Sequence, residues 1–293
     1  MYVIKTLNEI SPLGLDTLDK AKFSVSAEAS NPDAIIVRSA KVTADMLTPS
    51  LKCIARAGAG YNNICVDECT KRGITVFNTP GANANAVKEL VICALLLGSR
   101  DIVAGVNWAR TLTGGVAEAV EKGKSNFTGP EIFGKTLGVV GLGAIGKRVA
   151  EAASALGMRV IGYDPFVVNE YSVEENELYA ASDYITLHLP VVAETKGKYN
   201  AELLSKFKKG ARLINIARGE LCDNAAVIAA LGNGTLAKYI TDFPTEDLLN
   251  RENVIAIPHL GASTPESEEN CAIMACNQVA DFLLNGKVTN KVN

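Results

Sequence analysis

The sequence has no long apolar run. A membrane-spanning helix needs roughly 18–20 consecutive apolar residues, and the longest candidate, from Leu90 to Leu97, ends at Gly98. The first residues, Met1 to Lys5, lack the basic start and the small-residue cleavage site of a secretion signal. We therefore expect no membrane association, and we expect the chain to begin with a strand.

Histidine is scarce, and the cysteines lack metal-ligand spacing. The chain has 2 histidines, His188 and His259, and 7 cysteines without a CxxC pair. We therefore expect no zinc site and predict no other metal. Scattered cysteines in an odd number are typical of free thiols in a reducing cytoplasm.

An excess of positive charge is also missing, because 29 Lys and Arg face 32 Asp and Glu, for a net charge of -3. A nucleic-acid-binding protein usually presents a basic face, so nucleic acid is not an expected partner. The composition is otherwise globular, with 48% hydrophobic and 21% charged residues. A length of 293 residues favours two domains, at roughly 150 residues each.

Short β-rich runs alternate with helical patterns along the chain. Such alternation with continuously apolar strands predicts an α/β fold, with parallel sheets covered on both faces. The expected strands are 2–6, 34–37, 53–56, 75–77, 137–140, 159–162, 184–188, 211–216, 238–241 and 254–257. The expected helices include 145–156, 224–231, a long helix from 83 to about 110 and a closing helix over 264–284, with a polar segment at 122–134.

The strand at 137–140 runs into a GxGxxG loop that opens a helix. In a dinucleotide-binding fold, Gly141 would permit the tight turn, Gly143 the approach of a pyrophosphate, and Gly146 the close packing of helix on strand. The helix N-terminus would present free N–H groups to the phosphates. Asp164 ends the next strand and would accept hydrogen bonds from the adenosine ribose, which favours NAD over NADP.

Three segments resemble the D-isomer-specific 2-hydroxyacid dehydrogenase family: 141–146, 215–220 and 258–264. The likeness extends over nearly the whole chain. It implies two Rossmann-like domains with parallel sheets and the active cleft between them. Residues 1–82 with 263–293 would form the substrate (catalytic) domain, and residues 83–262 the NAD-binding domain. Family members are usually homodimers, so a homodimer is expected.

The resemblance also implies catalytic Arg218, Glu246 and His259. The family motif Asp-Val-Phe-x-x-Glu-Pro is one residue shorter here, in Thr241 to Asp247, so Asp247 stays open as the alternative acid. His188 is expected to be structural or near the cofactor. The implied cofactor contacts are Gly141, Gly143, Ala144, Ile145, Gly146, Asp164, Pro190, Ala217 and Asp242, with Ala144 standing where many members have arginine.

These residue types suit the oxidation of a secondary alcohol. An imidazole such as that of His259 gains and loses a proton close to neutral pH and can serve as the base. Arg218 would hold the α-carboxylate of the acid and polarise the oxygen on C2. A carboxylate beside the imidazole would orient the ring and stabilise its charged form.

The segments 37–40 and 56–63 resemble the substrate loops of those members that oxidise 3-phosphoglycerate. They imply substrate contacts from Arg38, Arg56 and Gly58, and NAD-dependent oxidation of D-3-phosphoglycerate to 3-phosphohydroxypyruvate, the first step of phosphorylated serine biosynthesis. The alternatives are another acid, such as glyoxylate, hydroxypyruvate or D-lactate, and an NAD(H)-sensing, co-repressor-like binding protein. Because the chain ends soon after the closing helix, we expect no C-terminal regulatory domain.

Overall fold

The computed structural model describes residues 1–293. The chain divides into two compact units: unit 1 comprises Met1–Ala86 and Ala262–Asn293, and unit 2 comprises Val87–Gly261. The boundaries expected from the sequence, after residues 82 and 262, lie within a few residues of these. Each unit holds one parallel sheet, of 5 strands in unit 1 and 6 in unit 2, so the predicted α/β class is confirmed.

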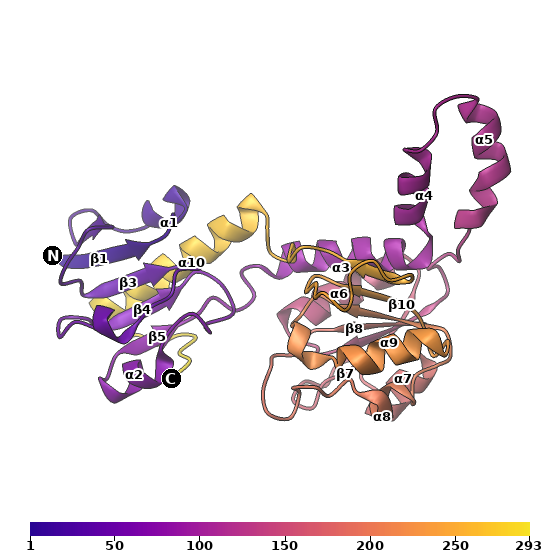
Figure 1. Cartoon of the computed structure of the whole chain (residues 1–293). Helices are drawn as coiled ribbons and strands as arrows, with labels where there is room; N and C mark the ends of the chain where they lie inside the picture. The colour runs from indigo at the N-terminus through magenta and orange to yellow at the C-terminus, as the bar shows by residue number, and fades with distance from the viewer. The chain divides into compact units, whose positions relative to one another are not determined.

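Unit 1 is built on a sheet with the strand order β2-β1-β3-β4-β5. Its strands are β1 (Tyr2–Leu7), β2 (Phe23–Ser26), β3 (Ala34–Val37), β4 (Cys53–Arg56) and β5 (Thr75–Phe77). Its helices are α1 (Pro12–Leu15), α2 (Val66–Lys71) and the closing α10 (Pro265–Asn285), with the short 3-10 turn η1 (Ala44–Met46). The chain thus returns to unit 1 through α10, as Figure 1 shows in yellow.

Both faces of this sheet are covered, which explains its unbroken apolar strands. In β3, Ala34 and Ile36 join the hydrophobic cluster that includes α10, whereas Ile35 and Val37 join a second cluster that includes Cys69 of α2. Successive side chains of a strand point to opposite faces. The sheet therefore lies between α10 on one side and α2 with its flanking loops on the other.

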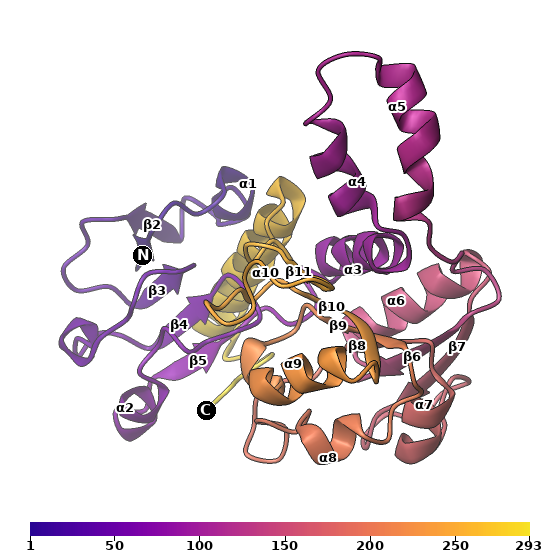
Figure 2. The same cartoon turned by 45° about the vertical axis from the view of Figure 1, so that its right-hand side comes forward.

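Unit 2 has the strand order β11-β10-β9-β8-β6-β7. The strands are β6 (Thr136–Val140), β7 (Arg159–Tyr163), β8 (Tyr184–Leu187), β9 (Ala211–Asn215), β10 (Leu236–Thr241) and β11 (Val254–Ala256). The helices that follow them are α6 (Ala144–Ala155), α7 (Glu175–Ala181), α8 (Ala201–Leu204) and α9 (Asn224–Gly232), with the 3-10 turn η3 (Gly219–Leu221). Figure 2 shows α6, α7, α8 and α9 around the sheet.

The strand order of unit 2 reverses at β6. The chain passes from β6 to β7 on one side and then to β8 on the other, and β6 pairs in parallel with both. In open α/β sheets, ligands bind outside the carboxyl ends of the strands at such a switch point. The glycine loop at the end of β6 lies at this point.

The prediction of a single long helix from 83 to about 110 is wrong. The structure has two helices, α3 (Ala84–Ser99) and α4 (Ile102–Ala109). The break is held by contacts within unit 2, because Ser99 Oγ donates to the Pro130 carbonyl and Lys238 Nζ lies 2.6 Å from an Asp101 carboxylate oxygen. The segment expected to be merely polar also holds structure at its start, since the end of α5 (Val116–Gly123) and η2 (Lys124–Phe127) occupy residues 122–127.

The other expected elements are confirmed within one or two residues, and only the edge strand β2 has no counterpart among the expected strands. The closing helix begins as expected, with Pro265 in its first turn and Thr264 Oγ1 accepting a hydrogen bond from the Ser267 N–H at 3.1 Å. No helix has the length and apolar composition needed to cross a bilayer.

Candidate active site

The glycine loop between β6 and α6 is closely packed at two glycines and open at the third. Gly141 has φ +93°, and a Cβ there would lie 2.6 Å from the His188 carbonyl oxygen. A Cβ on Gly146 would lie 1.8 Å from the Gly141 carbonyl oxygen, whereas a Cβ on Gly143 would meet nothing within 4 Å. The first two glycines thus let the backbone turn and pack, and Gly143 leaves space open beside the loop.

The start of α6 offers donors for an anion. Its N-cap residue is Gly143, and no side chain caps it. The exposed Ala144 and the half-buried Ile145 follow in its first turn. An uncapped helix N-terminus presents N–H groups and the positive end of the helix dipole. This part of the site therefore fits the pyrophosphate of a dinucleotide.

Asp164 lies at the end of β7 and ties that strand to the glycine loop. Its Oδ2 accepts a hydrogen bond from the Leu142 N–H at 2.8 Å, and its Oδ1 accepts from the Phe166 N–H at 2.8 Å and the Val167 N–H at 3.1 Å. These bonds fix the carboxylate beside the loop. Its contact with a ribose stays a prediction, and so does the contact of the exposed Pro190 with the cofactor.

Arg218 follows β9 on a turn that Asn215 holds. The fully buried Asn215 accepts bonds at Oδ1 from the N–H groups of Ala217 (3.2 Å) and Arg218 (3.3 Å), and its Nδ2 donates to the Arg218 carbonyl at 2.8 Å. No role for Asn215 is predicted from the sequence. The sequence does contain a signal for such a role, because an asparagine that ends a buried apolar strand must find hydrogen-bond partners.

His259 and Asp242 are joined through their backbones. The His259 N–H donates to the Asp242 carbonyl at 2.9 Å, and the His259 ring lies 4.8 Å from the Phe243 ring, centroid to centroid. His259 has φ +46°, a conformation uncommon for a non-glycine residue. Its side chain is exposed. The backbone thus presents the imidazole to solvent just beyond β11.

The Asp242 carboxylate lies close to the charges of both His259 and Arg218. It is only 1% exposed, its Oδ2 accepts a bond from the Gly261 N–H at 2.9 Å, and its Oδ1 is buried without a partner. Burial raises the pKa of Asp242, while the Gly261 N–H and the positive charges of His259 and Arg218 oppose that shift. The structure therefore brings Arg218, Asp242 and His259 together at the carboxyl ends of β9, β10 and β11.

No contact joins Glu246 to Arg218, Asp242 or His259. Its side chain is exposed, and the structure gives it no hydrogen bond and no ion pair. The alternative acid, Asp247, is already hydrogen-bonded to other residues. Its Oδ1 accepts bonds from Thr245 Oγ1 at 2.5 Å and Asn224 Nδ2 at 3.3 Å. These bonds lower the pKa of Asp247. The pairing of Glu246 with His259 stays a prediction.

His188 differs sharply from His259. Its Nδ1 is buried without a partner, and its Nε2 lies 3.1 Å from Thr186 Oγ1. Burial lowers the pKa of His188 to about 3. This imidazole is therefore neutral near pH 7 and unsuited to exchange protons there.

In unit 1, the predicted substrate residues Arg38, Arg56 and Gly58 lie at or just beyond the ends of β3 and β4. Arg56 ends β4 and donates from Nε to the Arg38 carbonyl at 3.0 Å. The Arg56 guanidinium lies against Gly58, where a Cβ would be 1.4 Å from Nη1. Only glycine therefore fits at position 58 while the Arg56 side chain keeps this position. The bond from Arg56 to the Arg38 carbonyl links the ends of β3 and β4.

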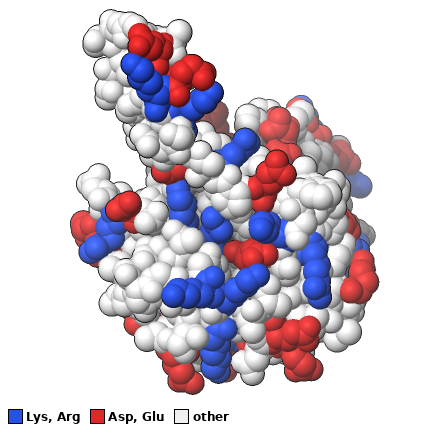
Figure 3. Space-filling view, turned by 90° about the vertical axis from the view of Figure 1, so that its right-hand side faces the viewer, with Lys and Arg blue, Asp and Glu red and all other residues white.

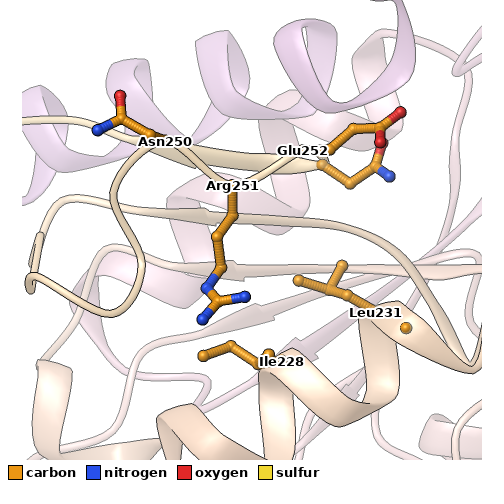
Figure 4. A pocket seen from close by; sticks show the side chains of 7 residues that line it. Ile228, Leu231, Asn250, Arg251 and Glu252 are labelled. Atoms are coloured by element: carbon orange, nitrogen blue, oxygen red, sulfur yellow. The ribbon is translucent and has the colours of Figure 1, made fainter.

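A surface depression of about 470 Å³ lies elsewhere on unit 2, between the end of α9 and the loop before β11. Figure 4 shows the Arg251 side chain extending from that loop toward Ile228 and Leu231. None of the predicted site residues lines it. In the whole chain, no group of three or more His, Cys, Asp and Glu side chains could hold a metal ion, and all 7 cysteines are free.

A parallel sheet with an open glycine loop at its switch point defines a dinucleotide-binding unit of the Rossmann type. The chain belongs to the D-isomer-specific 2-hydroxyacid dehydrogenase family, whose NAD-binding domain matches residues 94–261. NAD is therefore its cofactor. The glycine loop fits this cofactor, and the unpartnered Oδ1 of Asp242 is an acceptor that an amide N–H of the cofactor could satisfy.

The relatives differ in substrate. D-3-phosphoglycerate dehydrogenase of Rattus norvegicus is 35% identical over 302 residues, covering 96% of this chain and 55% of the relative. This chain thus spans about half the length of that relative. A solved NAD+-bound 3-phosphoglycerate dehydrogenase of Entamoeba histolytica is 33% identical with TM-score 0.82, covering 100% of this chain and 98% of that one. The apo D-mandelate dehydrogenase of Rhodotorula graminis is 25% identical with TM-score 0.86, covering 100% and 97%.

Proposed function

We propose that this chain catalyses the NAD-dependent oxidation of D-3-phosphoglycerate to 3-phosphohydroxypyruvate, the first step of phosphorylated serine biosynthesis, in the cytoplasm. The observation that carries this proposal is the pair of arginines at the ends of the adjacent strands β3 and β4, Arg38 and Arg56. A cationic pair in a chain of net charge -3 suits the phosphate of a substrate whose carboxylate Arg218 would hold. The 7 free cysteines support a reducing compartment.

In this proposal, Arg38, Arg56 and Gly58 bind the phosphate end of the substrate. Arg218 holds the α-carboxylate and polarises the oxygen on C2. His259 accepts the hydroxyl proton, and Glu246 orients its ring. When bound, NAD accepts the hydride. Asp164 binds the adenosine ribose, and Asp242, Pro190 and Ala217 contribute further cofactor contacts.

A substrate panel tests the proposal. We expect kcat/KM for D-3-phosphoglycerate to exceed that for D-glycerate, its phosphate-free counterpart, by about 10- to 100-fold, the value of one charge-assisted hydrogen bond. NADH absorbance measures oxidation of these acids and reduction of glyoxylate, hydroxypyruvate and pyruvate. A preference for a phosphate-free acid would move the chain to another branch of the family. Tight NADH binding without turnover of any acid would favour a sensor.

We also propose a homodimer that covers α4. No residue of α4 is buried, and Ile102, Val103 and Val106 are 38–45% exposed. The α4–α5 hairpin projects from the rest of unit 2 in Figures 1 and 2. Figure 3 shows side chains of both charge signs on the projection. On α5, Lys122 and Glu118 form an ion pair at 2.7 Å. An apolar face on a projecting helix is typical of a protein contact.

Sedimentation velocity tests this assembly. We expect the wild type to sediment as a dimer, and Val106→Glu to sediment largely as a monomer because a buried unpaired charge is costly in an interface. Lys122→Glu, on the charged side of the same hairpin, is the control and should remain dimeric. A dimer that survives Val106→Glu would remove α4 from the contact.

A further inference from the structure

Arg38 is paired with an acidic residue from the other end of the chain. Its Nη2 donates to Oε1 of Glu268, and the two side chains are 42% and 40% exposed. Both residues belong to unit 1. One of the two arginines proposed to bind the substrate phosphate therefore already holds a carboxylate.

The backbone fixes both partners of this pair. The Glu268 N–H donates to the Thr264 carbonyl at 3.2 Å, in the first turn of α10, which Thr264 caps. On the other side, the Arg38 carbonyl accepts bonds from Arg56 Nε at 3.0 Å and Asn63 Nδ2 at 3.4 Å. The carboxylate thus comes from a helix terminus and the guanidinium from a braced strand end, so their meeting is a feature of the fold.

The charges of this cluster determine how it receives a phosphate. Arg38 and Arg56 supply two positive charges, and Glu268 cancels one. A phosphate monoester carries about -1.5 to -2 charges near pH 7. When it contacts Arg38, it lies beside a carboxylate of the same sign, and like charges at close range repel. A phosphate-free acid brings no charge to this end of the cluster.

We propose that Glu268 is a specificity-determining residue. To bind Arg38, the substrate phosphate has to displace the Glu268 carboxylate or share the guanidinium with it. This inference rests on the proposed function. The carboxylate weakens binding of the phosphorylated acid and leaves phosphate-free acids unaffected. Glu268 contacts no reacting atom in this scheme and acts only through Arg38.

Glu268→Gln separates charge from position, because the amide oxygen can still accept a bond from Arg38. We expect its KM for D-3-phosphoglycerate to fall about 3- to 10-fold at low ionic strength, with kcat and the KM for NAD unchanged. The difference should shrink in high salt, where exposed charges are screened. Glu266→Gln removes the same charge from the same turn, but Glu266 is exposed and has no ion pair, so this control should match the wild type.

Competitive inhibition by inorganic phosphate, measured with whichever acid the wild type oxidises, gives a second readout that does not depend on turnover of the phosphorylated acid. We expect the inhibition constant for phosphate to fall in Glu268→Gln by a similar factor. An unchanged or raised KM and inhibition constant in this variant would overturn the inference. Turnover of phosphate-free acids alone would overturn the proposed substrate, while the phosphate inhibition still tests Glu268.

Discussion

Replacing His259 by alanine is expected to lower kcat by about 10²- to 10⁴-fold, the usual contribution of a general base, with little change in NADH affinity. His259 presents its ring to solvent beside Phe243, outside the glycine loop. The only other histidine, His188, cannot substitute, because burial lowers its pKa to about 3. Initial rates and a fluorescence titration with NADH measure the two quantities separately.

The backbone at position 259 requires a control. His259 has φ +46°, and asparagine tolerates that conformation better than most residues. His259→Asn therefore tests the imidazole without backbone strain. We expect both variants to lose kcat while the unfolding temperature of His259→Asn stays close to that of the wild type. Equal losses of kcat and NADH affinity would instead indicate a structural role for His259.

Local patterns predict much of this fold. The strand before Gly141 and the helix after Gly143 are consecutive, so a pattern of apolar residues and glycines suffices to place them. The helix break after Ser99 could not be predicted in the same way, because its contacts come from Pro130 and Lys238. The short edge strand β2 has no counterpart among the predicted strands, because it is only four residues long and buries only one side chain.

The site depends still more on tertiary structure. The neighbourhood of Asp242 and His259 exists because β10 and β11 pair in parallel, with Thr241 opposite Ala256. The contact between Arg38 and Glu268 joins residues 230 positions apart. Sequence motifs can identify Arg218, Asp242 and His259 as candidates, but the proximity of the Asp242 carboxylate to the other two side chains emerges only from the folded sheet.

Alanine at Gly146 is expected to lower the stability of the fold, and alanine at Gly143 the affinity for NAD, although the two glycines share one loop. At Gly146, the new Cβ would lie 1.8 Å from the Gly141 carbonyl oxygen and 3.2 Å from Val139 Cγ1. The first of these atoms belongs to the backbone and cannot swing away. We expect Gly146→Ala to cost about 2–3 kcal/mol of stability, as overpacking does, and to lower the unfolding temperature by roughly 5–10 °C.

Gly143→Ala meets nothing within 4 Å, and its φ of -68° is allowed for alanine. The free protein should therefore unfold at the wild-type temperature. Its NAD affinity should fall by about 10-fold or more, equivalent to about 1.4 kcal/mol, because the methyl group occupies space where the pyrophosphate approaches the loop. Thermal unfolding with and without NAD measures both effects. If Gly143→Ala keeps full NAD stabilisation, the pyrophosphate does not bind beside Gly143, and the role of this loop as the cofactor cradle is wrong.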